Sequence, residues 1–469
     1  MLKIRHTANL MNGSGMFRAL LSVLFVWSFL WATAQAPAKV EGAVEVLGIA
    51  LSGNTTTKAR IILRELVVYE GDTLSHAALY EKLERSRQNL MNTGLFNTVT
   101  ALPLYLDADH VMVEVTVSER WYLWPAIIFD LADPNFNTWW LTRDPERVNY
   151  GLYLYRYNLR GRNETGYVKA QFGYTRQFAL RYKVPNLTRN QRWGINIGAS
   201  YEEQAEITTG TTGNLRTLIR DRTGSNRDQW KADVEMTHRR GHDIRHTWRL
   251  QFIQAEARDT IINSAIDYFD GPATATRYLA LGYSFVWDQR DARAFPRHGH
   301  YQEVRVDRLG LGVLDRASPD ITTLYATSKH WITLHEKWTL GLSVRGKHTF
   351  GTPPYFVQEG LGYGHYVRGY EYYIIDGEHF ALGKANLIFQ LVKPRTYRVE
   401  HIPLEAFRTF YVALYLNAYS DLGRVWDGRY QAGNPLANRW INGNGIGLNL
   451  VTSYDQVLRG EYSVNAEGE

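Results

Sequence analysis

The feature that most constrains this chain is a two-residue alternation of apolar and charged side chains, which recurs in short segments from Trp121 onward. Between Trp230 and Thr237, the even positions are Trp, Ala, Val and Met, and the odd positions are Lys, Asp, Glu and Thr. Because successive side chains of a β-strand point to opposite faces, a period of two predicts strands with one apolar and one charged face.

Such strands fit a barrel that spans a membrane. A soluble β-sandwich also alternates, so the deciding points are the full charges on one face and the aromatic residues near the strand ends. Both are typical of a barrel with lipid outside, a polar lumen inside and aromatic girdles at the interfaces. The mean hydropathy of −0.34 excludes several apolar helical spans, and an aromatic content of 13% excludes a disordered chain.

The alternating segments number fifteen, which sets the expected size of the barrel. They cover residues 121–130, 149–159, 165–174, 176–184, 193–202, 228–238, 243–256, 276–288, 299–309, 322–334, 338–350, 382–392, 409–422, 445–453 and 457–464. Bacterial single-chain barrels have even strand numbers. We therefore expect a mostly β, antiparallel transmembrane barrel of about 15–16 strands over residues 121–469, with its last strand missing.

The first 34 residues have the pattern of an export signal. An apolar run from Ala19 to Trp31 follows Arg18 and precedes two A-x-A sites. A run of this length is too short to cross a bilayer as a helix, whereas a basic flank and a small-residue ending are typical of signal peptides. We expect cleavage after Ala34. A buried core helix is the alternative, and either Met1 or Met16 is the start.

Residues 44–119 differ from the rest because they combine strand and helix patterns. A β-rich run ends at the turn Gly53-Asn54, and a helix-like segment follows as far as Gly71-Asp72. A second helix begins at Ser75 and stops at Gly94, and two alternating strands complete the segment. The pattern predicts a small β-α-α-β-β module before the barrel.

This module resembles a POTRA domain, the periplasmic module of the BamA-like outer-membrane assembly superfamily. The matching residues are Gly53, Asn54, Gly71, Asp72, Gly94, Phe96 and the closing run from Val115 to Arg120. The resemblance implies that an exposed strand edge of the module receives incoming polypeptide. The alternative is a spacer that binds nothing.

A second resemblance to the same superfamily lies in the barrel region. Val367-Arg368-Gly369-Tyr370, between the eleventh and twelfth expected strands, is similar to the V-R-G-F/Y signature of its long sixth extracellular loop. The run from Tyr419 to Gly423 is similar to the wall motif that meets this loop. The resemblance implies that Arg368 pairs with Asp421 in the lumen, beside Gly423. The alternative is a solvated loop Arg and an unrelated strand-end Asp.

Three weaker motifs support the same resemblance in a common order along the chain. Asn158 to Glu164 resembles an N-L-x-G-x-G/N-E hairpin, and Tyr182 to Asn186 resembles a strand-ending Y-x-x-P. The third resembles D-x-R-D followed by P-x-x-G, and its residues are Asp288, Arg290, Asp291, Pro296 and Gly299. Each motif alone is also a good turn sequence.

The sequence offers no sign of catalysis. It contains no Cys, which excludes a thiolate nucleophile, a disulfide framework and a cysteine metal site. No H-E-x-x-H, P-loop or G-x-S-x-G motif is present, and His298-Gly299-His300 has no carboxylate cluster beside it. The formal net charge is +6 without a dense Lys/Arg block. We therefore expect no catalytic residue, no metal, no cofactor and no nucleic-acid partner.

The resemblance implies a location in the bacterial outer membrane and a role in assembling other proteins there. The expected partners are unfolded outer-membrane or secreted polypeptides and outer-membrane lipids, with periplasmic chaperones or lipoproteins as further candidates. Substrate strands would pair at a weak seam between the first and last strands. A translocator for one dedicated polypeptide, a passive pore and a purely structural role remain open, as does the identity of the clients.

Overall fold

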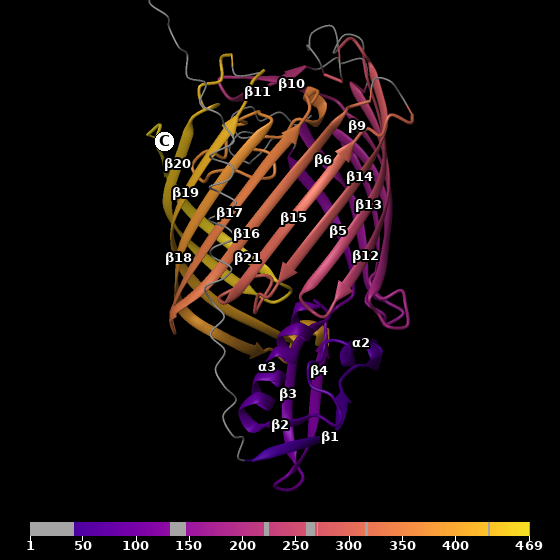
Figure 1. The fold of residues 1–469 in the computed structure, drawn as a ribbon, viewed down its shortest axis with the longest axis vertical. Coiled ribbons are helices and arrows are strands. Elements are labelled where there is room, and N and C mark those ends of the chain that lie inside the picture. The colour runs from indigo at the N-terminus through magenta and orange to yellow at the C-terminus, as the bar shows by residue number, and fades with distance from the viewer. Residues whose placement is uncertain are drawn as a thin grey trace, which may run out of the picture.

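The computed structural model describes residues 42–131, 147–219, 225–258, 268–269, 271–314, 318–429 and 432–468. The expected signal segment lies outside these ranges. Figure 1 shows two parts, a small module and a large tilted barrel above it. In the part of the chain that the structure describes, no helix combines the length and the apolar character needed to span a bilayer.

The module has the elements β1 (Ala43–Ser52), α2 (Ala59–Leu63), β2 (Thr73–Ser75), α3 (His76–Asn92), β3 (Phe96–Tyr105) and β4 (His110–Glu119). Its sheet has the order β2-β1-β4-β3, so β3 is an edge strand. The expected β-α-α-β-β order is present with one addition. The three-residue strand β2 escaped the pattern because it is too short to alternate and ends at Ser75, which caps α3.

Helix α3 forms where the sequence signals place it. The Ser75 hydroxyl accepts a hydrogen bond from the amide N–H of Ala78 at 3.2 Å, which satisfies one free donor of the first turn. Leu79, Leu83 and Leu90 lie on one face and are buried against the sheet. After the helix ends, Gly94 adopts a φ of +74°, which a residue with a Cβ rarely adopts.

The other module residues singled out in the sequence lie in turns or in the core of the module. Gly53 has a φ of +81°, and a Cβ there would overlap the carbonyl oxygen of Val117. The side-chain amide of Asn54 donates to the Thr57 carbonyl at 3.0 Å. Gly71 has a φ of +85°, Asp72 pairs with Lys82 at 2.9 Å, and Phe96 is fully buried. These residues shape turns and the core of the module.

The barrel wall is one sheet of fifteen strands in the described residues. Its strands are β5 (Leu123–Leu131), β6 (Val148–Leu159), β7 (Glu164–Gly173), β8 (Thr175–Val184), β9 (Trp193–Gln204), β12 (Arg227–Arg240), β13 (Ile244–Ala257), β14 (Ala275–Asp288), β15 (Gly299–Leu309), β16 (Ile321–His335), β17 (Trp338–Phe350), β18 (His379–Arg398), β19 (Thr409–Trp426), β20 (Trp440–Thr452) and β21 (Gln456–Asn465). This number is the one that the alternation predicts.

The two faces of the wall differ as the alternation requires. Outward residues such as Ile127 and Phe129 of β5 are 79% and 77% exposed. Inward residues are charged and paired, for example Arg181 of β8 with Asp233 of β12 at 2.8 Å. The apolar surface therefore faces outward, where a bilayer would lie, and the ions face the lumen.

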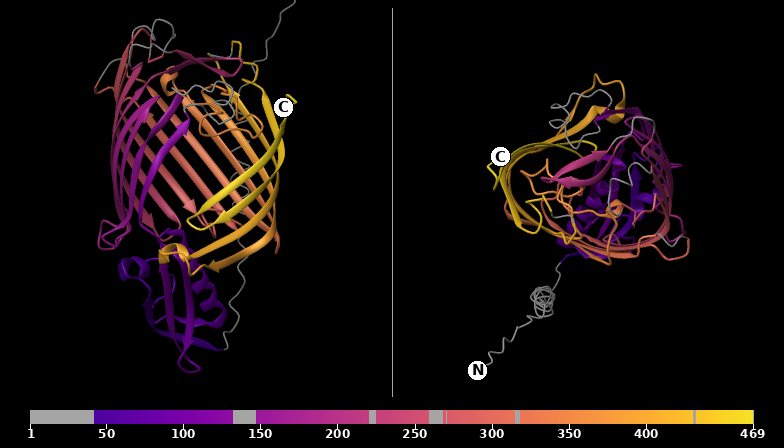
Figure 2. Two further views of the ribbon diagram at one scale, coloured as in Figure 1. Left: turned by 180° about the vertical axis from the view of Figure 1, so that it is seen from behind. Right: turned by 90° about the horizontal axis from the view of Figure 1, so that it is seen from above.

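In the part of the chain that the structure describes, the strands at the two ends of the sheet order, β5 and β21, each have one unpaired edge, and we call these two edges the seam. Every neighbouring pair in the sheet is antiparallel. Because fifteen strands alternate in direction, the first and the last run the same way. Figure 2 (left) shows the seam from behind, with β5 and β21 on opposite sides of it.

Two hairpins extend beyond the wall. At the end away from the module, β10 (Ile207–Thr212) and β11 (Leu215–Ile219) form a separate two-stranded sheet across the opening of the barrel (Figures 1 and 2). At the module end, β18 and β19 continue past the wall and are joined by the short helix α6 (Glu405–Arg408). The sequence pattern missed β10 and β11 and ended β18 at residue 392.

The module packs against the turns at one end of the barrel. Its backbone N–H at Lys58 donates to the Gly161 carbonyl at 2.9 Å, and Arg85 of α3 pairs with Asp243 at 2.6 Å. The side chain of Asn97 donates to the Ala406 carbonyl at 2.7 Å. The module therefore contacts turns from several parts of the wall and covers this end of the lumen.

Candidate functional site

The loop of residues 351–378, between β17 and β18, lies inside the ring of strands in the view down the barrel (Figure 2, right). Arg368 anchors it to β19. Its Nη2 lies 2.6 Å from Oδ1 of Asp421 and its Nε 2.9 Å from Oδ2. Its main-chain N–H donates to Oδ2 at 3.1 Å. Asp421 is fully buried and Arg368 is 7% exposed, so the structure brings together the two residues that the motifs single out.

Four further side chains complete the surroundings of Arg368. Its Nη1 lies 3.2 Å from Glu461 of β21, and its Nη2 donates to Asn386 of β18 at 2.9 Å. The guanidinium carbon lies 3.6 Å from the ring centre of Tyr419. Lys384 of β18 contacts the buried carboxylate as well, at 3.0 Å. The loop is therefore tied to β18, β19 and the edge strand β21.

The rest of the loop motif fits closely against the wall. Val367 and Tyr370 are both 1% exposed. A Cβ at Gly423 would lie 2.5 Å from Cγ2 of Val367, and a Cβ at Gly443 of β20 would overlap the carbonyl oxygen of the loop arginine. Gly369 has a φ of +90°, which favours glycine. Two small residues in the wall thus make room for the loop.

A second anchor joins the loop to the β10–β11 hairpin. Asp376 accepts hydrogen bonds from the hydroxyl of Thr211 in β10 at 2.9 Å and from that of Tyr355 at 3.1 Å. Tyr363 donates to the same carboxylate. The main-chain N–H of Ile374 donates to the Asn214 carbonyl at 2.8 Å. The loop and the hairpin together cover the lumen at the end away from the module.

At the opposite end, a buried carboxylate holds the module to the barrel. Glu65 of the module accepts two hydrogen bonds from Arg239 of β12, at 2.8 and 2.9 Å, and pairs with Arg64 at 2.6 Å. Burial alone would raise its pKa, but Arg239 and Arg64 outweigh burial and lower the pKa of Glu65 to about 2. The carboxylate is therefore charged at any physiological pH.

The turn motif between β14 and β15 also touches the module. Arg290 forms two hydrogen bonds to Asp288, at 2.7 and 2.8 Å. The main-chain carbonyl of Asp291 accepts from the Asn92 side chain of α3 at 3.1 Å. Pro296 is buried, and Gly299 has a φ of +100° where a Cβ would overlap the Gln289 carbonyl. The motif shapes a loop that docks on α3.

Four aromatic residues meet at the module end of the seam, and we call them the basal cluster. They are Trp121, Trp124, Phe407 and Tyr454, which come from the start of β5, from α6 and from the β20–β21 turn. The ring of Trp124 lies 5.1 Å from that of Tyr454 and 5.8 Å from that of Phe407. Beside them, Arg120 pairs with Asp455 at 2.7 Å. The two sheet edges are thus connected at this end although their strands do not pair.

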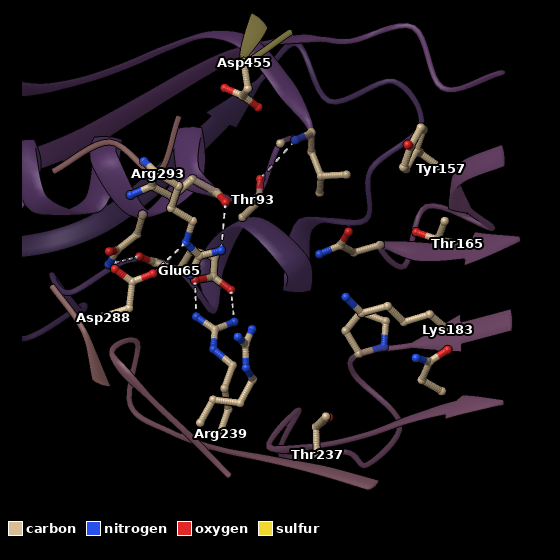
Figure 3. A pocket seen from close by; sticks show the side chains of 18 of the residues that line it. Glu65, Thr93, Tyr157, Thr165, Lys183, Thr237, Arg239, Asp288, Arg293 and Asp455 are labelled. Carbon is tan, nitrogen blue, oxygen red and sulfur yellow. Dashed lines mark hydrogen bonds and ion pairs between the residues drawn. The ribbon is translucent and has the colours of Figure 1, made fainter. Parts of the chain in front are cut away.

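A cavity of about 960 Å³ lies between the module and the inner face of the wall. In Figure 3, Glu65 and Arg239 lie on one side of it and Lys183 lies on the other, beside Thr165 and Tyr157. Trp124 of β5 and Gln456 of β21 also line it, so it reaches both edges of the seam. Across the described ranges, no three His, Asp or Glu residues lie together as a metal site would require.

Sequence reasoning found Arg368 and Asp421 but missed the residues around them. Lys384, Asn386 and Glu461 occupy ordinary inward positions of alternating strands, so nothing in the local sequence separates them from other lumen residues. Gly443 lies in a Gly/Asn-rich segment, Asn442 to Gly447, whose repeated small residues were the only available signal.

Two family models match the chain, and solved structures with similar chains are known. A model described as "Omp85 superfamily domain" matches residues 158–454, and a POTRA model described as "Surface antigen variable number repeat" matches residues 44–120. BamA from Haemophilus ducreyi lacking POTRA domains 1–3 is 14% identical, with 90% of this chain and 84% of that chain covered and a TM-score of 0.48. CdiB from Escherichia coli is 12% identical, with 98% and 96% covered and a TM-score of 0.46. No curated protein matches the chain.

The Omp85 model covers more than half of the chain, and the POTRA model covers the module. The barrel therefore lies in the outer membrane and the POTRA domain in the periplasm. Members of this family are non-enzymatic transporters or assembly factors that handle polypeptides. The chain belongs to the Omp85 superfamily, with one POTRA domain before its barrel.

Proposed function

We propose that this protein inserts polypeptide strands into the outer membrane at the seam between β5 and β21. The observation that carries the proposal is that, among the described residues, β5 and β21 each lack a neighbour on one side of the fifteen-stranded wall. Main-chain N–H and C=O groups that face lipid without a partner cost several kcal/mol each. A strand that enters the seam satisfies those groups on two edges at once.

The direction of the strands specifies the geometry of such an insertion. β5 begins at the POTRA domain and runs outward, and β21 runs the same way because the described wall has an odd number of antiparallel strands. Direct pairing of the two edges would be parallel. One additional strand that runs from the outside toward the periplasm is antiparallel to both, as are all the other pairs in the wall.

The POTRA domain would receive the polypeptide before it reaches the seam. Its edge strand β3 has no neighbour on one side, and Leu102 and Leu104 on this strand are 59% and 55% exposed. An exposed edge with apolar side chains suits strand addition. Periplasmic chaperones or lipoproteins would deliver the polypeptide, and the surrounding lipid would receive the finished barrel.

In this proposal the pair of Arg368 and Asp421 positions the loop and does no chemistry. Through Glu461 the same arginine also contacts β21. It therefore holds one edge of the seam to the interior of the barrel. Gly423 lets the loop lie close enough for these contacts.

Site-directed cross-linking tests the insertion proposal, because the chain contains no native Cys. Phe129→Cys places a thiol on the outward face of edge strand β5, and Val344→Cys places one on the outward face of β17, which is paired on both sides. A stalled client barrel with a Cys in its terminal strand should cross-link to the first variant and not to the second. Equal cross-linking, or unchanged levels of other barrels after depletion, would contradict the proposal.

The second candidate is a translocator that passes one dedicated polypeptide through the lumen. The cavity behind the POTRA domain favours it, because a volume of about 960 Å³ accommodates several residues of extended chain. Secretion of one specific partner, with other barrels at normal levels, would support this candidate. Single-channel conductance of the purified protein separates both candidates from a passive pore, for which a large steady conductance is expected.

A further inference from the structure

The cavity between the POTRA domain and the wall carries an excess of positive charge. Ten Lys and Arg side chains line it, against six Asp and Glu. Most of these cations have an acidic partner, as Arg85 has in Asp243 and Arg249 has in Glu235. The pairs cancel locally, so the net charge of the cavity depends on the cations that remain.

Three lining cations have no carboxylate within ion-pair distance among the described residues, although Glu235 attracts Lys183 from further away. They are Lys183 of β8, Arg192 just before β9, and Arg245 of β13. Lys183 and Arg245 point from different strands into the same space, and β9 and β12 lie between their strands. The main-chain register places Lys183 opposite Asn196, Asn196 opposite Glu235 and Glu235 opposite Arg249, so Arg245 lies four residues away from this row along β13. The two cations therefore offer separate positions for anionic groups.

The loop between β14 and β15, which carries Arg293, also lies close to this excess of positive charge. Burial lowers the pKa of Arg293, and among the surrounding charges Arg245, Arg239 and Arg290 lower it further while Asp288 opposes them. A cavity with low-dielectric walls and one predominant sign of charge concentrates the opposite charge inside. The ligand that this cavity favours is therefore anionic.

A row of tyrosines along one side of the cavity indicates which shape of ligand fits. Tyr153, Tyr155 and Tyr157 all point inward from β6 and line the cavity. Consecutive rings in the row have centres 5.5 Å apart. Residues two apart on a strand recur about every 7 Å, which is also the repeat of alternate side chains in any extended polypeptide. The row can therefore lie along an extended chain.

We propose that this cavity binds an acidic, extended segment of a polypeptide, with its carboxylates toward Lys183, Arg192 and Arg245 and its other side chains along the tyrosine row. The inference rests on the proposed handling of polypeptides and specifies the class of segment. A membrane lipid is the less suitable occupant, because the tyrosine row and the three cations line the inner side of the wall, whereas the apolar surface of the wall faces outward. The cavity reaches both seam edges, so a segment bound here lies beside the site of insertion.

Fluorescence anisotropy on the full chain in detergent micelles tests this proposal. The probe is a fluorescein-labelled ten-residue peptide of alternating Glu and Ser. The K183Q/R245Q variant should bind it at least tenfold more weakly than the original chain, and added salt should weaken binding of the original chain. The matched control is K393Q/R395Q, which removes two exposed cations from the extension of β18 outside the cavity and should change binding less than twofold.

Each other outcome overturns the proposal. Absence of binding would refute the proposal, and equal loss in the two double variants would assign the interaction to general surface charge. Displacement of the peptide by vesicles of anionic phospholipid would assign the cavity to lipid. The single variant K183Q, with heat-modifiable migration as a measure of folding, replaces the double variant if that one fails to fold. Depletion tests the proposed function independently, because peptide binding to the purified chain does not depend on client assembly.

Discussion

Replacement of Arg368 by Met tests how firmly the loop is held. The substitution retains most of the side-chain volume and removes the charge. It removes the hydrogen bonds to Asp421, at 2.6 and 2.9 Å, and the contact with Glu461 at 3.2 Å. Loss of one partner of a buried ion pair typically costs about 3–5 kcal/mol. Because Lys384 still contacts the carboxylate at 3.0 Å, we expect the low end of this range, about 3 kcal/mol.

A change of about 3 kcal/mol corresponds to roughly a hundredfold shift toward the released loop. Hydrogen exchange of the amides in residues 361–370 measures this shift directly, and the barrel strands provide the internal reference. Lys384→Met should shift the exchange far less, because Lys384 is more exposed than Arg368 and leaves the arginine pair intact. If R368M changes loop exchange by less than threefold, the arginine does not hold the loop and the reasoning is wrong.

Three further predictions address other parts of the molecule. Because the pKa of Glu65 is lowered to about 2, its contribution to POTRA docking should be complete above about pH 4.5 and disappear as the pH falls through 2, as measured by fluorescence transfer between the two parts. Gly443→Ala should expose the loop to protease, whereas Gly460→Ala, which has open space around its Cβ position, should not. Phe407→Ala should weaken the basal cluster by about 1–3 kcal/mol and raise proteolysis of the β20–β21 turn.

The barrel could be predicted from the sequence because its main signal is local. A strand with one face in lipid and one in a charged lumen must alternate, and each segment shows this without reference to its neighbours. The β10–β11 hairpin was missed because its sequence does not alternate in this way. Its segment from Thr208 to Thr212 consists of Thr and Gly, and its apolar residues Ile207, Leu215, Leu218 and Ile219 do not alternate with polar ones.

The contacts of the site were only partly predictable, because they join distant residues. The link between Arg368 and Asp421 came from a resemblance to a known pair of motifs. Glu65 and Arg239 are 174 positions apart, and neither belongs to a motif. Their contact depends on how the POTRA domain sits on the barrel, which no local pattern encodes.

The seam and the basal cluster together suggest where opening would begin. Each aromatic pair in the cluster contributes about 0.5–1.5 kcal/mol beyond its buried area, and the exposed pair of Arg120 and Asp455 adds about 1 kcal/mol or less. Tyr454 and Asp455 both have positive φ angles, near +60°, so the turn that carries them is itself strained. β5 has nine residues and β21 has ten. A strand that hydrogen-bonds to their free main-chain groups stabilises the complex by several kcal/mol for each group that would otherwise face lipid unpaired. Strand pairing therefore exceeds the stability of the basal cluster after only a few hydrogen bonds, so the cluster can join the two edges of the seam without preventing insertion.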